Sequence, residues 1–535
     1  MIAFIQRRWV ANTLKVGVGL AFLLVTMRYV FKVPLIADDF YLYVDWARRR
    51  ATESFGDRLD LGGIFEAGRI LPIGTGFTPV WLDSIYAAGD LFGVSPDIVW
   101  RSWRIIAVVL AVIAASAFAV AWRLRSPVTG SARQVAGRAP WMDDLTTWFV
   151  VIAIATGSFI QIHSLWGNDP VTAYIYPAWG TCVLYFGYLA LLRPALRARG
   201  DLPAVALVLG AIVGVVGVWF YELFLPAIAL AALAIVVVGV RRALRAGMGA
   251  ALRPATALLA FSVLPGIAFL IPRLSGPGTV SGDAMYPGTS YKLSGQSLET
   301  FWGALVTSFP GSSWWKSREF VGPLAETQGV SVQLVVTLIL LIAFAWWLVR
   351  MQGASVQAGR PRRLSRVWLL GVLLAIGALT GPIAIQSVSS RWQDELGGGI
   401  GNVYTFWATS STAVALLVAM IVILLVTRAS PWPGAIAATV IAAIAVMQVS
   451  VNVQVEQLTQ AYLPVNMPII KALESDPATG DAERCAAITA LAAFPFPDYY
   501  EVGIGYSAVT AYKAEHGVPF CRAKPDIFDK PYLGG

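Results

Sequence analysis

The sequence predicts an all-α integral membrane protein with about eleven transmembrane helices. Its 535 residues are 57% hydrophobic and only 13% charged, and the mean hydropathy is +0.66. Soluble domains carry about 25% charged residues, so the charge density of this chain is roughly half of theirs. Apolar runs of about 18 residues or more recur along the chain, and each run can cross a bilayer as a helix. Lipid is therefore the expected solvent for most of the chain.

Eleven apolar segments account for the predicted spans. They lie at residues 12–32, 98–122, 144–162, 171–192, 203–221, 223–240, 255–272, 330–349, 367–386, 403–427 and 434–451. Arg7 and Arg8 precede the first segment in the manner of a signal peptide. No cleavage site of small residues follows, and Lys15 interrupts the run, so we expect an uncleaved first span.

Arg residues gather in alternate short connections, which sets the predicted orientation. The basic connections hold Arg123 to Arg138, Arg193 to Arg199, Arg241 to Arg253, Arg350 to Arg366, and Arg428. By the positive-inside rule, these connections and the N-terminus face the cytoplasm. An odd number of spans then places the C-terminus outside.

The predicted outer side receives the longest connections. They cover residues 33–97 and 273–329, with shorter pieces near 163–170, 221–222 and 387–402, and with the tail from 452 to 535. Connections of this length usually carry function. We therefore expect a transmembrane domain over residues 1–451, a periplasmic segment over residues 452–535, and chemistry on the outer face.

Several function classes are disfavoured by what the sequence contains. The net charge of +9 does not indicate a nucleic-acid partner, because the basic residues are mostly Arg in short clusters between apolar runs. The chain has no Walker P-loop, so ATP is not expected. Two histidines, His163 and His516, do not assemble into a Ser-His-Asp triad, and no Cys/His cluster has zinc spacing.

The segment VPLIADDFYLY, residues 33–43, places two adjacent carboxylates directly after the first predicted span. One interpretation is that Asp39 caps an amphipathic interfacial helix, since Asp is favoured at helix N-termini. The second interpretation is chemical and compatible with the first. A partly desolvated carboxylate of Asp38 or Asp39 can take a proton from a substrate hydroxyl or hold a metal ion.

The acids of ADDF, residues 37–40, follow an N-terminal span and begin a long outer loop, and in this the chain resembles the GT-C glycosyltransferases. The resemblance implies transfer of a sugar, with inversion, from a polyprenyl-phosphate donor to a glycan, lipid or protein acceptor of the cell envelope. It also implies that Asp38 or Asp39 is the general base, with the other as a cap or supporting group. The leaving polyprenyl phosphate is already an anion, so it needs cationic or amide donors rather than a proton.

Three basic residues in the predicted outer loops are candidates for binding the donor phosphate. Arg391 lies in SVSSRWQDELGGGIGN, where it can grip phosphate through two hydrogen bonds or pair with Asp394 or Glu395. Lys292 and Arg318 lie in the second long loop. The segment SSWWKSREF there places two Trp residues at the expected membrane interface.

Two further acids are secondary candidates. Asp169, in HSLWGNDPVTAYIYP, resembles by position the acid that GT-C enzymes often carry in a second outer loop to place a metal or the donor, although Asp-Pro is also an ordinary turn. Glu222, in WFYELFLP, faces a cavity or partner if it is deep in the membrane, or solvent if the chain turns there. The sequence does not identify metal ligands, and a divalent cation stays open.

The outer tail is predicted to form a small cap. Cys485 and Cys521 flank its polar part and can pair as a disulfide if the segment lies outside the cytoplasm. The cap either binds an acceptor glycan through its tyrosines or acts as a structural lid. The excess of Arg over Lys and the high Ala content suggest a high-GC bacterium, which would make the membrane the inner one and the outer face periplasmic.

Two rival functions are left open. An O-antigen polymerase or ligase also acts on lipid-linked glycans, but it would rely on outer Arg and His residues rather than on a first-loop acid. A transporter or lipid flippase would move its substrate without forming a glycosidic bond, and the lack of an evident internal repeat weakens this alternative. The expected partners are the lipid-linked donor, the acceptor and membrane lipids, with no nucleic acid.

Overall fold

Every regular element in the described part of the chain is helical. The computed structural model describes residues 8–35, 37–58, 72–122, 141–163, 169–172, 175–196, 202–275, 292–314, 330–356, 366–396, 399–426, 430–462, 465–493, 498–526 and 528. No β-strand occurs in these ranges. The predicted all-α class therefore holds for the chain as described.

Long apolar helices form the body of the molecule. They are α2 (Arg8–Lys32), α7 (Pro96–Trp122), α8 (Trp141–Phe159), α9 (Ile175–Ala195), α10 (Leu202–Phe220), α11 (Leu225–Ala246), α16 (Val332–Val356), α17 (Arg366–Ser387), α19 (Phe406–Val426) and α20 (Trp432–Tyr462). A further apolar rod joins η3 (Met248–Ala251), α12 (Leu252–Leu258), η4 (Leu259–Val263) and α13 (Leu264–Ser275). The helices outside this set are α3 (Ala37–Thr52), α4 (Phe55–Arg58), α6 (Pro72–Phe92), α14 (Gly295–Thr307), α18 (Ser390–Leu396), α21 (Asn466–Leu473), α22 (Asp481–Ala492) and α23 (Asp498–His516).

The helix lengths are those of a multi-pass membrane protein. Within the described ranges, nine helices are long and apolar enough to cross a membrane. Helices α8 and α10 contribute shorter apolar stretches, Leu145–Phe159 and Ala204–Phe220. Each apolar segment predicted from the sequence falls on one of these helices, because an uninterrupted apolar run leaves a chain in lipid no alternative to internal hydrogen bonding.

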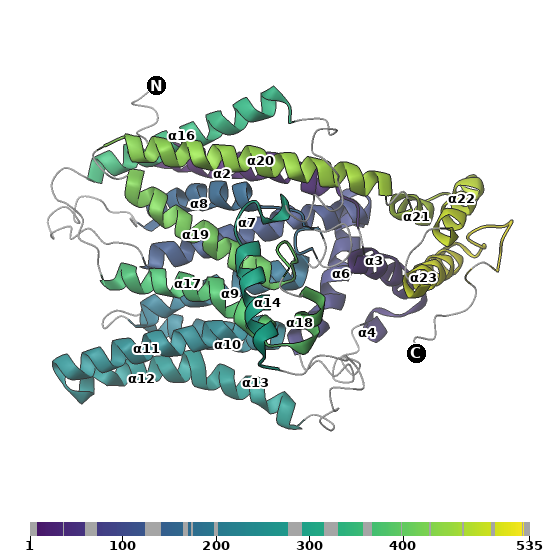
Figure 1. Ribbon diagram of the computed structural model, residues 1–535. Coiled ribbons are helices and arrows are strands. Elements are labelled where there is room, and N and C mark those ends of the chain that lie inside the picture. Colours follow the sequence, from purple (N-terminus) through teal and green to yellow (C-terminus); the bar gives the residue numbers. More distant parts are fainter. Residues whose placement is uncertain are drawn as a thin grey trace.

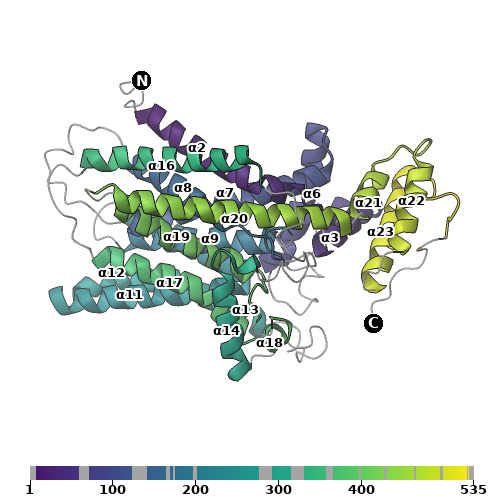
Figure 2. The ribbon, with the colours of Figure 1, turned by 45° about the horizontal axis from the view of Figure 1, so that its top comes forward.

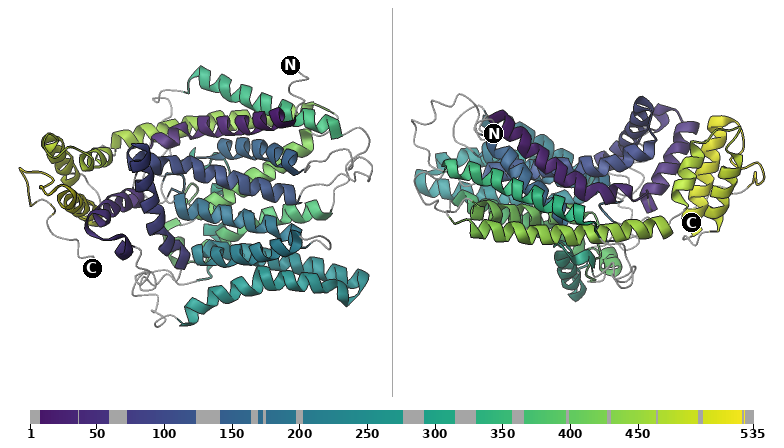
Figure 3. Two further views of the ribbon diagram at one scale, coloured as in Figure 1. Left: turned by 180° about the vertical axis from the view of Figure 1, so that it is seen from behind. Right: turned by 90° about the horizontal axis from the view of Figure 1, so that it is seen from above.

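The long helices run side by side in one bundle, and α3, α6, α21, α22 and α23 gather at one end of it (Figure 1). We call this the cap end. Helices α21 to α23 stand beyond the bundle as a separate group (Figure 2). Seen from above, α14 and α18 project from one side of the bundle, and α2 starts at the end opposite the cap end (Figure 3). Helix α2 therefore ends near the cap end, and the acid pair of α3 follows it there.

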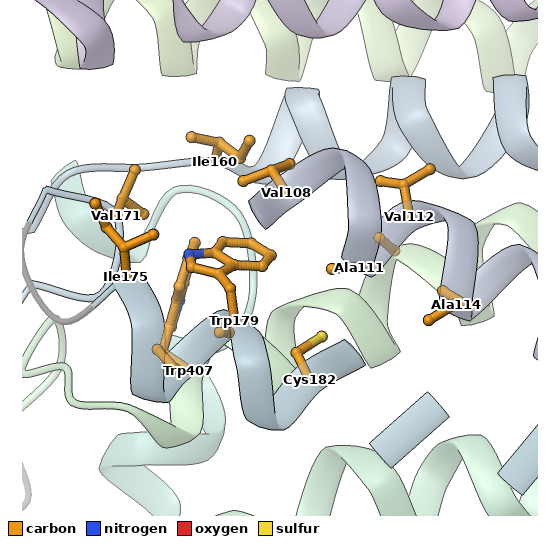
Figure 4. Packing of buried hydrophobic residues seen from close by; sticks show 14 of the residues in the cluster. Val108, Ala111, Val112, Ala114, Ile160, Val171, Ile175, Trp179, Cys182 and Trp407 are labelled. Carbon is orange, nitrogen blue, oxygen red and sulfur yellow. The ribbon is translucent and has the colours of Figure 1, made fainter. Parts of the chain in front are cut away.

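The centre of the bundle forms where α7, α9 and α19 meet. Val108 and Ala111 of α7 lie beside Trp179 and Cys182 of α9 and Trp407 of α19 (Figure 4). The rings of Trp179 and Trp407 meet edge to face, with centroids 6.3 Å apart. All five side chains are buried. In lipid, close packing of this kind is a main force that holds helices together, because the hydrophobic effect between them is small.

Contacts between α2 and α8 explain how Lys15 is accommodated in the first span. Its Nζ donates a hydrogen bond to Oγ1 of Thr147 over 3.0 Å, and the Lys15 side chain is buried. Further along the same pair, a Cβ atom on Gly157 would lie 2.9 Å from both Phe22 and Thr26. Glycine at this position therefore allows the two backbones to approach closely.

The C-terminal cap, residues 465–526, is a small helical unit closed by one disulfide. Helix α20 runs past the expected domain boundary at residue 451, so the cap follows a continuous helix that begins in the bundle. Cys485 and Cys521 are joined by a disulfide. It links α22 covalently to the segment that follows α23.

A buried arginine organises the inside of the C-terminal cap. Arg484 donates to the carbonyl oxygens of Phe520 and Asp476, each over 2.8 Å. Its guanidinium carbon lies 4.6 Å from the ring centroid of Tyr512. The side chain is fully buried, so these acceptors and the aromatic ring replace the water that the charge has lost.

Candidate functional site

The acid pair lies in the first turn of α3. This helix begins at Ala37, so Asp38 and Asp39 are inside the helix rather than ahead of it. The cap interpretation of Asp39 requires a later helix start and does not describe its position. Carboxylates in a first turn are still favoured by the positive end of the helix dipole. The side chain of Asp38 lies outside the part that the structure describes.

Asp39 is held by α7 within a group of aromatic rings. Its side chain is only 4% exposed, and Oδ2 accepts a hydrogen bond from Nε1 of Trp100 over 3.1 Å. The Trp100 ring meets Trp81 edge to face at 4.9 Å and Tyr43 at 6.1 Å. Trp81 stacks in turn on Tyr176 at 5.2 Å. We call these four rings the aromatic cluster. Its packing holds the indole of Trp100 in the position from which it donates to Asp39.

Arg104 of α7 joins two separate segments of the chain. Its Nη1 donates to the carbonyl oxygens of Val30 over 2.8 Å and Val33 over 2.5 Å. Its Nη2 donates to the carbonyl oxygens of Pro34 over 3.1 Å and Thr172 over 2.8 Å. The side chain is 1% exposed. One guanidinium thus binds both the turn that leads to the acid pair and the segment that follows α8.

Asp169 shapes the second of these segments. Its Oδ1 accepts the backbone N–H groups of Val171 over 2.8 Å and Thr172 over 3.3 Å. Its Oδ2 accepts the backbone N–H of His163 over 2.6 Å. The Asp169 side chain is fully buried. This geometry favours the turn interpretation, because an Asx turn uses the carboxylate for the local backbone.

The charges around Arg104 link the two acids electrostatically. Asp39 and Asp169 both act on the guanidinium as negative charges, as does Asp97, whereas Arg101 opposes them. A buried ion loses several kcal/mol of hydration, and carbonyl acceptors with nearby carboxylates offset that loss. The structure therefore brings Asp39 and Asp169, which are distant in the sequence, to the same buried cation.

A seam of buried polar side chains continues from His163 toward α14 and α20. Nε2 of His163 lies 3.3 Å from Oγ of Ser312, and Nε2 of Gln161 donates to the same hydroxyl over 3.1 Å. Gln448 donates from Nε2 to Oγ of Ser313 over 2.9 Å. These hydrogen bonds join the segment after α8, the segment after α14 and helix α20 through buried side chains.

The predicted phosphate-binding residues lie on a unit formed by α14, α17 and α18. Lys292 is exposed, and its backbone N–H donates to the carbonyl of Val388 over 2.7 Å. Gln393 donates from Nε2 to the carbonyl of Lys292 over 2.6 Å, so the segments that carry Lys292 and Arg391 lie together. The side chain of Arg391 and the whole of Arg318 lie outside the described residues. Their phosphate roles stay predictions.

Two cations on α2 were not among the predicted site residues. Exposed side chains follow one stripe of this helix at four-residue spacing, namely Leu24, Arg28 and Lys32. The stripe changes from apolar to basic over the last two turns of α2, the helix that precedes the acid pair in the chain. Basic side chains at the end of a span extend toward lipid phosphates. The signal in the sequence was the i, i+4 pair of cations at the end of the first apolar run.

Glu222 lies at a turn between two helices. Helix α10 ends at Phe220, and the short helix η2 (Glu222–Phe224) precedes the start of α11 at Leu225. Glu222 is half-buried there. It therefore sits at the end of two spans rather than deep within one. Across the ranges that the structure describes, no group of three or more His, Cys, Asp or Glu side chains could hold a metal ion.

The C-terminal cap docks on the helix that carries the acids. Asn466 donates from Nδ2 to the carbonyl of Leu35 over 2.7 Å, immediately before α3. Ser507 donates from Oγ to Oδ1 of Asp45 over 3.3 Å, and α23 packs along α3. The cap therefore braces the acid-bearing helix from the side opposite to α7.

A second contact between the cap and the bundle joins two carboxyl groups through one hydroxyl. Oγ of Ser95 lies 2.5 Å from Oδ1 of Asp97 and 2.5 Å from Oε1 of Glu474. A hydroxyl donates only one proton, so the other contact requires a proton on a carboxyl group. Burial raises the pKa of Glu474, and the charge of Asp97 raises it further. Glu474 is therefore the group suited to carry that proton.

The sequence held a signal for the role of α7 that the predicted outer loop, ending at residue 97, did not use. The stretch WRSWR, residues 100–104, places Arg101 and Arg104 in the first turns of an apolar span. An ionisable residue inside a span is a functional-site hypothesis by default. Both arginines reach the segment 30–35, Arg101 through the carbonyl of Phe31 over 3.3 Å, and Arg104 also reaches Thr172, which only the packed structure shows.

These contacts define the candidate site as the acid pair, the aromatic cluster, Arg104 and the Asp169 turn, all at the cap end. Within the described residues, this site places a buried carboxylate, Asp39, beside aromatic rings and near a buried arginine. No protein-family model, no curated protein and no solved structure matches the chain.

Proposed function

We propose that this chain is a membrane glycosyltransferase of the GT-C type. It moves a sugar from a polyprenyl-phosphate donor to a glycan, lipid or protein acceptor of the cell envelope. In this proposal the chain crosses the bacterial inner membrane eleven times, and the cap end faces the periplasm. The observation that supports the proposal best is the acid pair in the first turn of α3, shortly after the first apolar helix, with Asp39 hydrogen-bonded to Trp100 of α7.

The two acids take different roles in this proposal. Asp39 is buried, and its carboxylate accepts the indole N–H of Trp100. Such a group is suited to hold the first turn of α3 in place. We therefore assign the general-base role to Asp38, its neighbour in the same turn, and the supporting role to Asp39.

The reaction is an in-line displacement. Asp38 takes the proton from the acceptor hydroxyl as the hydroxyl oxygen forms a bond to the anomeric carbon, on the face opposite to the phosphate. The bond between that carbon and the phosphate oxygen breaks, its electron pair goes to the oxygen, and polyprenyl phosphate leaves as an anion. A positioned base contributes about 10²–10⁴-fold to a rate of this kind.

Cations at the membrane boundary would hold the donor phosphate. Arg28 and Lys32 are exposed on the last two turns of α2. Asp38 is the sixth residue after Lys32, so the chain allows at most about 20 Å between their Cα atoms. Lys292 and Arg391 are candidates for the same charge from the α14 and α18 side.

A transfer assay with purified protein in lipid nanodiscs tests the proposal. Short-chain polyprenyl-phosphate hexoses and pentoses, each with a radiolabelled sugar, are offered with envelope glycolipid acceptors. We expect labelled acceptor and free polyprenyl phosphate from the wild type. Asp38→Asn should lower kcat by at least about 100-fold, whereas Asp39→Asn should lower it less because that carboxylate acts through position. Lys471→Gln, on an exposed residue of α21, is the matched control.

The same assay separates the rivals. A polymerase or ligase would keep its activity in a folded Asp38→Asn, Asp39→Asn double variant. A transporter or flippase would move labelled lipid across the bilayer of proteoliposomes and release no polyprenyl phosphate. Either result contradicts the proposed mechanism.

A further inference from the structure

We propose that Arg104 is a positioning residue, which holds two turns of the cap end in one fixed arrangement, one that leads to the acid pair and one that contains Asp169. The two turns are residues 30–35, which lead to the acid pair, and residues 169–172, which contain Asp169. The part of this inference that concerns catalysis rests on the proposed function. The part that concerns the joining of the two turns does not.

The shape of the guanidinium suits this role. Its two terminal nitrogens carry four hydrogens, and all four are used on backbone carbonyls. Three of them bind Val30, Val33 and Pro34, and the fourth binds Thr172. Because a guanidinium is planar and rigid, the two turns cannot shift against each other without breaking at least one of these bonds.

Each turn passes its position on to an acid. Thr172 accepts from Arg104 through its carbonyl and donates its N–H to Oδ1 of Asp169 over 3.3 Å. On the other side, Pro34 lies four residues before Asp38, and the intervening carbonyl of Leu35 is bound by the C-terminal cap. Arg104 therefore contacts both the segment that precedes the acid pair and the turn that contains Asp169, whereas Arg101 donates to the first of these segments, at the carbonyl of Phe31 over 3.3 Å.

A lysine could not do the same. It would keep the positive charge, which Asp39, Asp97 and Asp169 attract and which Arg101 repels. Its three hydrogens leave from a single nitrogen and cannot reach four carbonyls on two segments. The Arg104→Lys variant therefore removes the two-nitrogen geometry that binds four carbonyls and retains the positive charge. This makes it the informative substitution.

Hydrogen–deuterium exchange of the full chain in nanodiscs measures the joining directly. In Arg104→Lys, we expect the amides of residues 30–35 and 169–172 to exchange together, at least about tenfold faster than in the wild type. The control is Ser116→Ala on the same helix, because Ser116 bonds only within α7, to the carbonyl of Val112 over 2.6 Å. Unchanged exchange in Arg104→Lys, or a change confined to one turn, overturns the proposal.

A measurement on the wild type covers the case in which Arg104→Lys does not fold. As urea is added, the two turns should lose protection at the same concentration, because one residue holds both. Loss of protection at clearly different concentrations overturns the joining.

Kinetics test the positioning role separately. In Arg104→Lys, kcat should fall at least about tenfold, and it should fall by a larger factor than the KM for the polyprenyl-phosphate sugar rises, because Arg28 and Lys32 themselves are not replaced. Faster exchange with an unchanged kcat overturns the positioning role. If the wild type shows no sugar transfer at all, the proposed function fails, and the exchange result still decides whether Arg104 joins the turns.

Discussion

The indole N–H of Trp100 on α7 donates a hydrogen bond over 3.1 Å to the carboxylate of Asp39 on α3, 61 residues earlier in the chain. Both side chains are buried. This bond connects the second long apolar helix to the first turn of α3, and it makes the position of the acid pair a property of the bundle rather than of the local sequence.

Removing that donor should affect function more than folding. Trp100→Phe keeps an aromatic ring in the cluster and leaves the Asp39 carboxylate short of one donor, at a cost of about 1–3 kcal/mol. We expect kcat for sugar transfer to fall about tenfold while the protein still folds. The measurements are kcat, KM and the thermal midpoint. Trp103→Phe, at a half-buried position on the same helix, is the control and should change none of these three quantities. An equal loss in both variants would contradict a specific role for the Trp100–Asp39 bond.

Docking of the C-terminal cap should weaken as the pH rises. The pKa of Glu474 is raised in the folded state from its usual value of 4.5, with burial as the main cause. A raised acid pKa means that the folded state holds its proton more tightly than the unfolded state. The contribution is complete below about pH 4.5, and it is lost as the pH rises through the folded-state pKa.

Exchange protection of α21 amides measured between pH 4 and pH 8 reports this effect. Glu474→Gln keeps a neutral hydrogen-bonding group beside Ser95, so its protection should not depend on pH in this window. Tyr43, Asp97 and Arg101 face the same contact and stay unchanged in both proteins. Equal pH dependence in the wild type and in Glu474→Gln would assign the effect to another group.

The disulfide should carry much of the stability of the C-terminal cap. It closes a separation of 36 residues, for which the chain-entropy estimate is about 3–4 kcal/mol. We expect the double variant Cys485→Ser, Cys521→Ser to become sensitive to limited proteolysis between residues 465 and 526 at a lower urea concentration than the wild type. Cys182→Ser, at the buried free cysteine of α9, is the control. Sugar transfer should also fall, because the cap braces α3 through Asn466.

Neutralising the two cations on α2 should weaken donor binding. In Arg28→Gln, Lys32→Gln we expect the KM for the polyprenyl-phosphate sugar to rise about tenfold, with kcat within about twofold of the wild type. The wild-type KM should also rise with salt, because exposed charges are screened, and this dependence should be smaller in the variant. Lys471→Gln, an exposed lysine of the C-terminal cap, should behave as the wild type. A fall in kcat with KM unchanged would place these cations elsewhere in the mechanism.

The sequence predicted the helical class and the positions of the long apolar helices of the bundle, because the need to satisfy backbone groups in lipid makes long apolar runs helical. It did not predict α6, whose residues fall in the predicted loop 33–97. The pairing of Cys485 with Cys521 was also accessible, since these two cysteines flank one polar segment. Helix boundaries were less accessible. The boundary expected at residue 451 falls inside α20, which continues to Tyr462 because helical propensity does not change where the polarity of the surroundings changes.

The candidate site was accessible only in part. The acids were visible as charges beside an apolar run, and so was Asp169 in its Asp-Pro turn. Their partners were not visible, because an arginine within WRSWR can face lipid, water or the bundle interior with the same local sequence. Arg101 pairs with Asp97 over 2.6 Å and donates to the carbonyl of Phe31 over 3.3 Å, whereas Arg104, three residues later, is buried and also reaches the carbonyl of Thr172.

What the sequence determined by itself is the multi-pass membrane character of this protein and the positions of its long apolar helices, since both follow from local composition. What only the tertiary structure decided is the set of long-range contacts: Asp39 with Trp100, Arg104 with Thr172, and Glu474 with Ser95. The physical reason is that apolar periodicity specifies which residues enter the membrane but not which helices become neighbours. Neighbours are chosen by packing and by the need of each buried polar group for a partner.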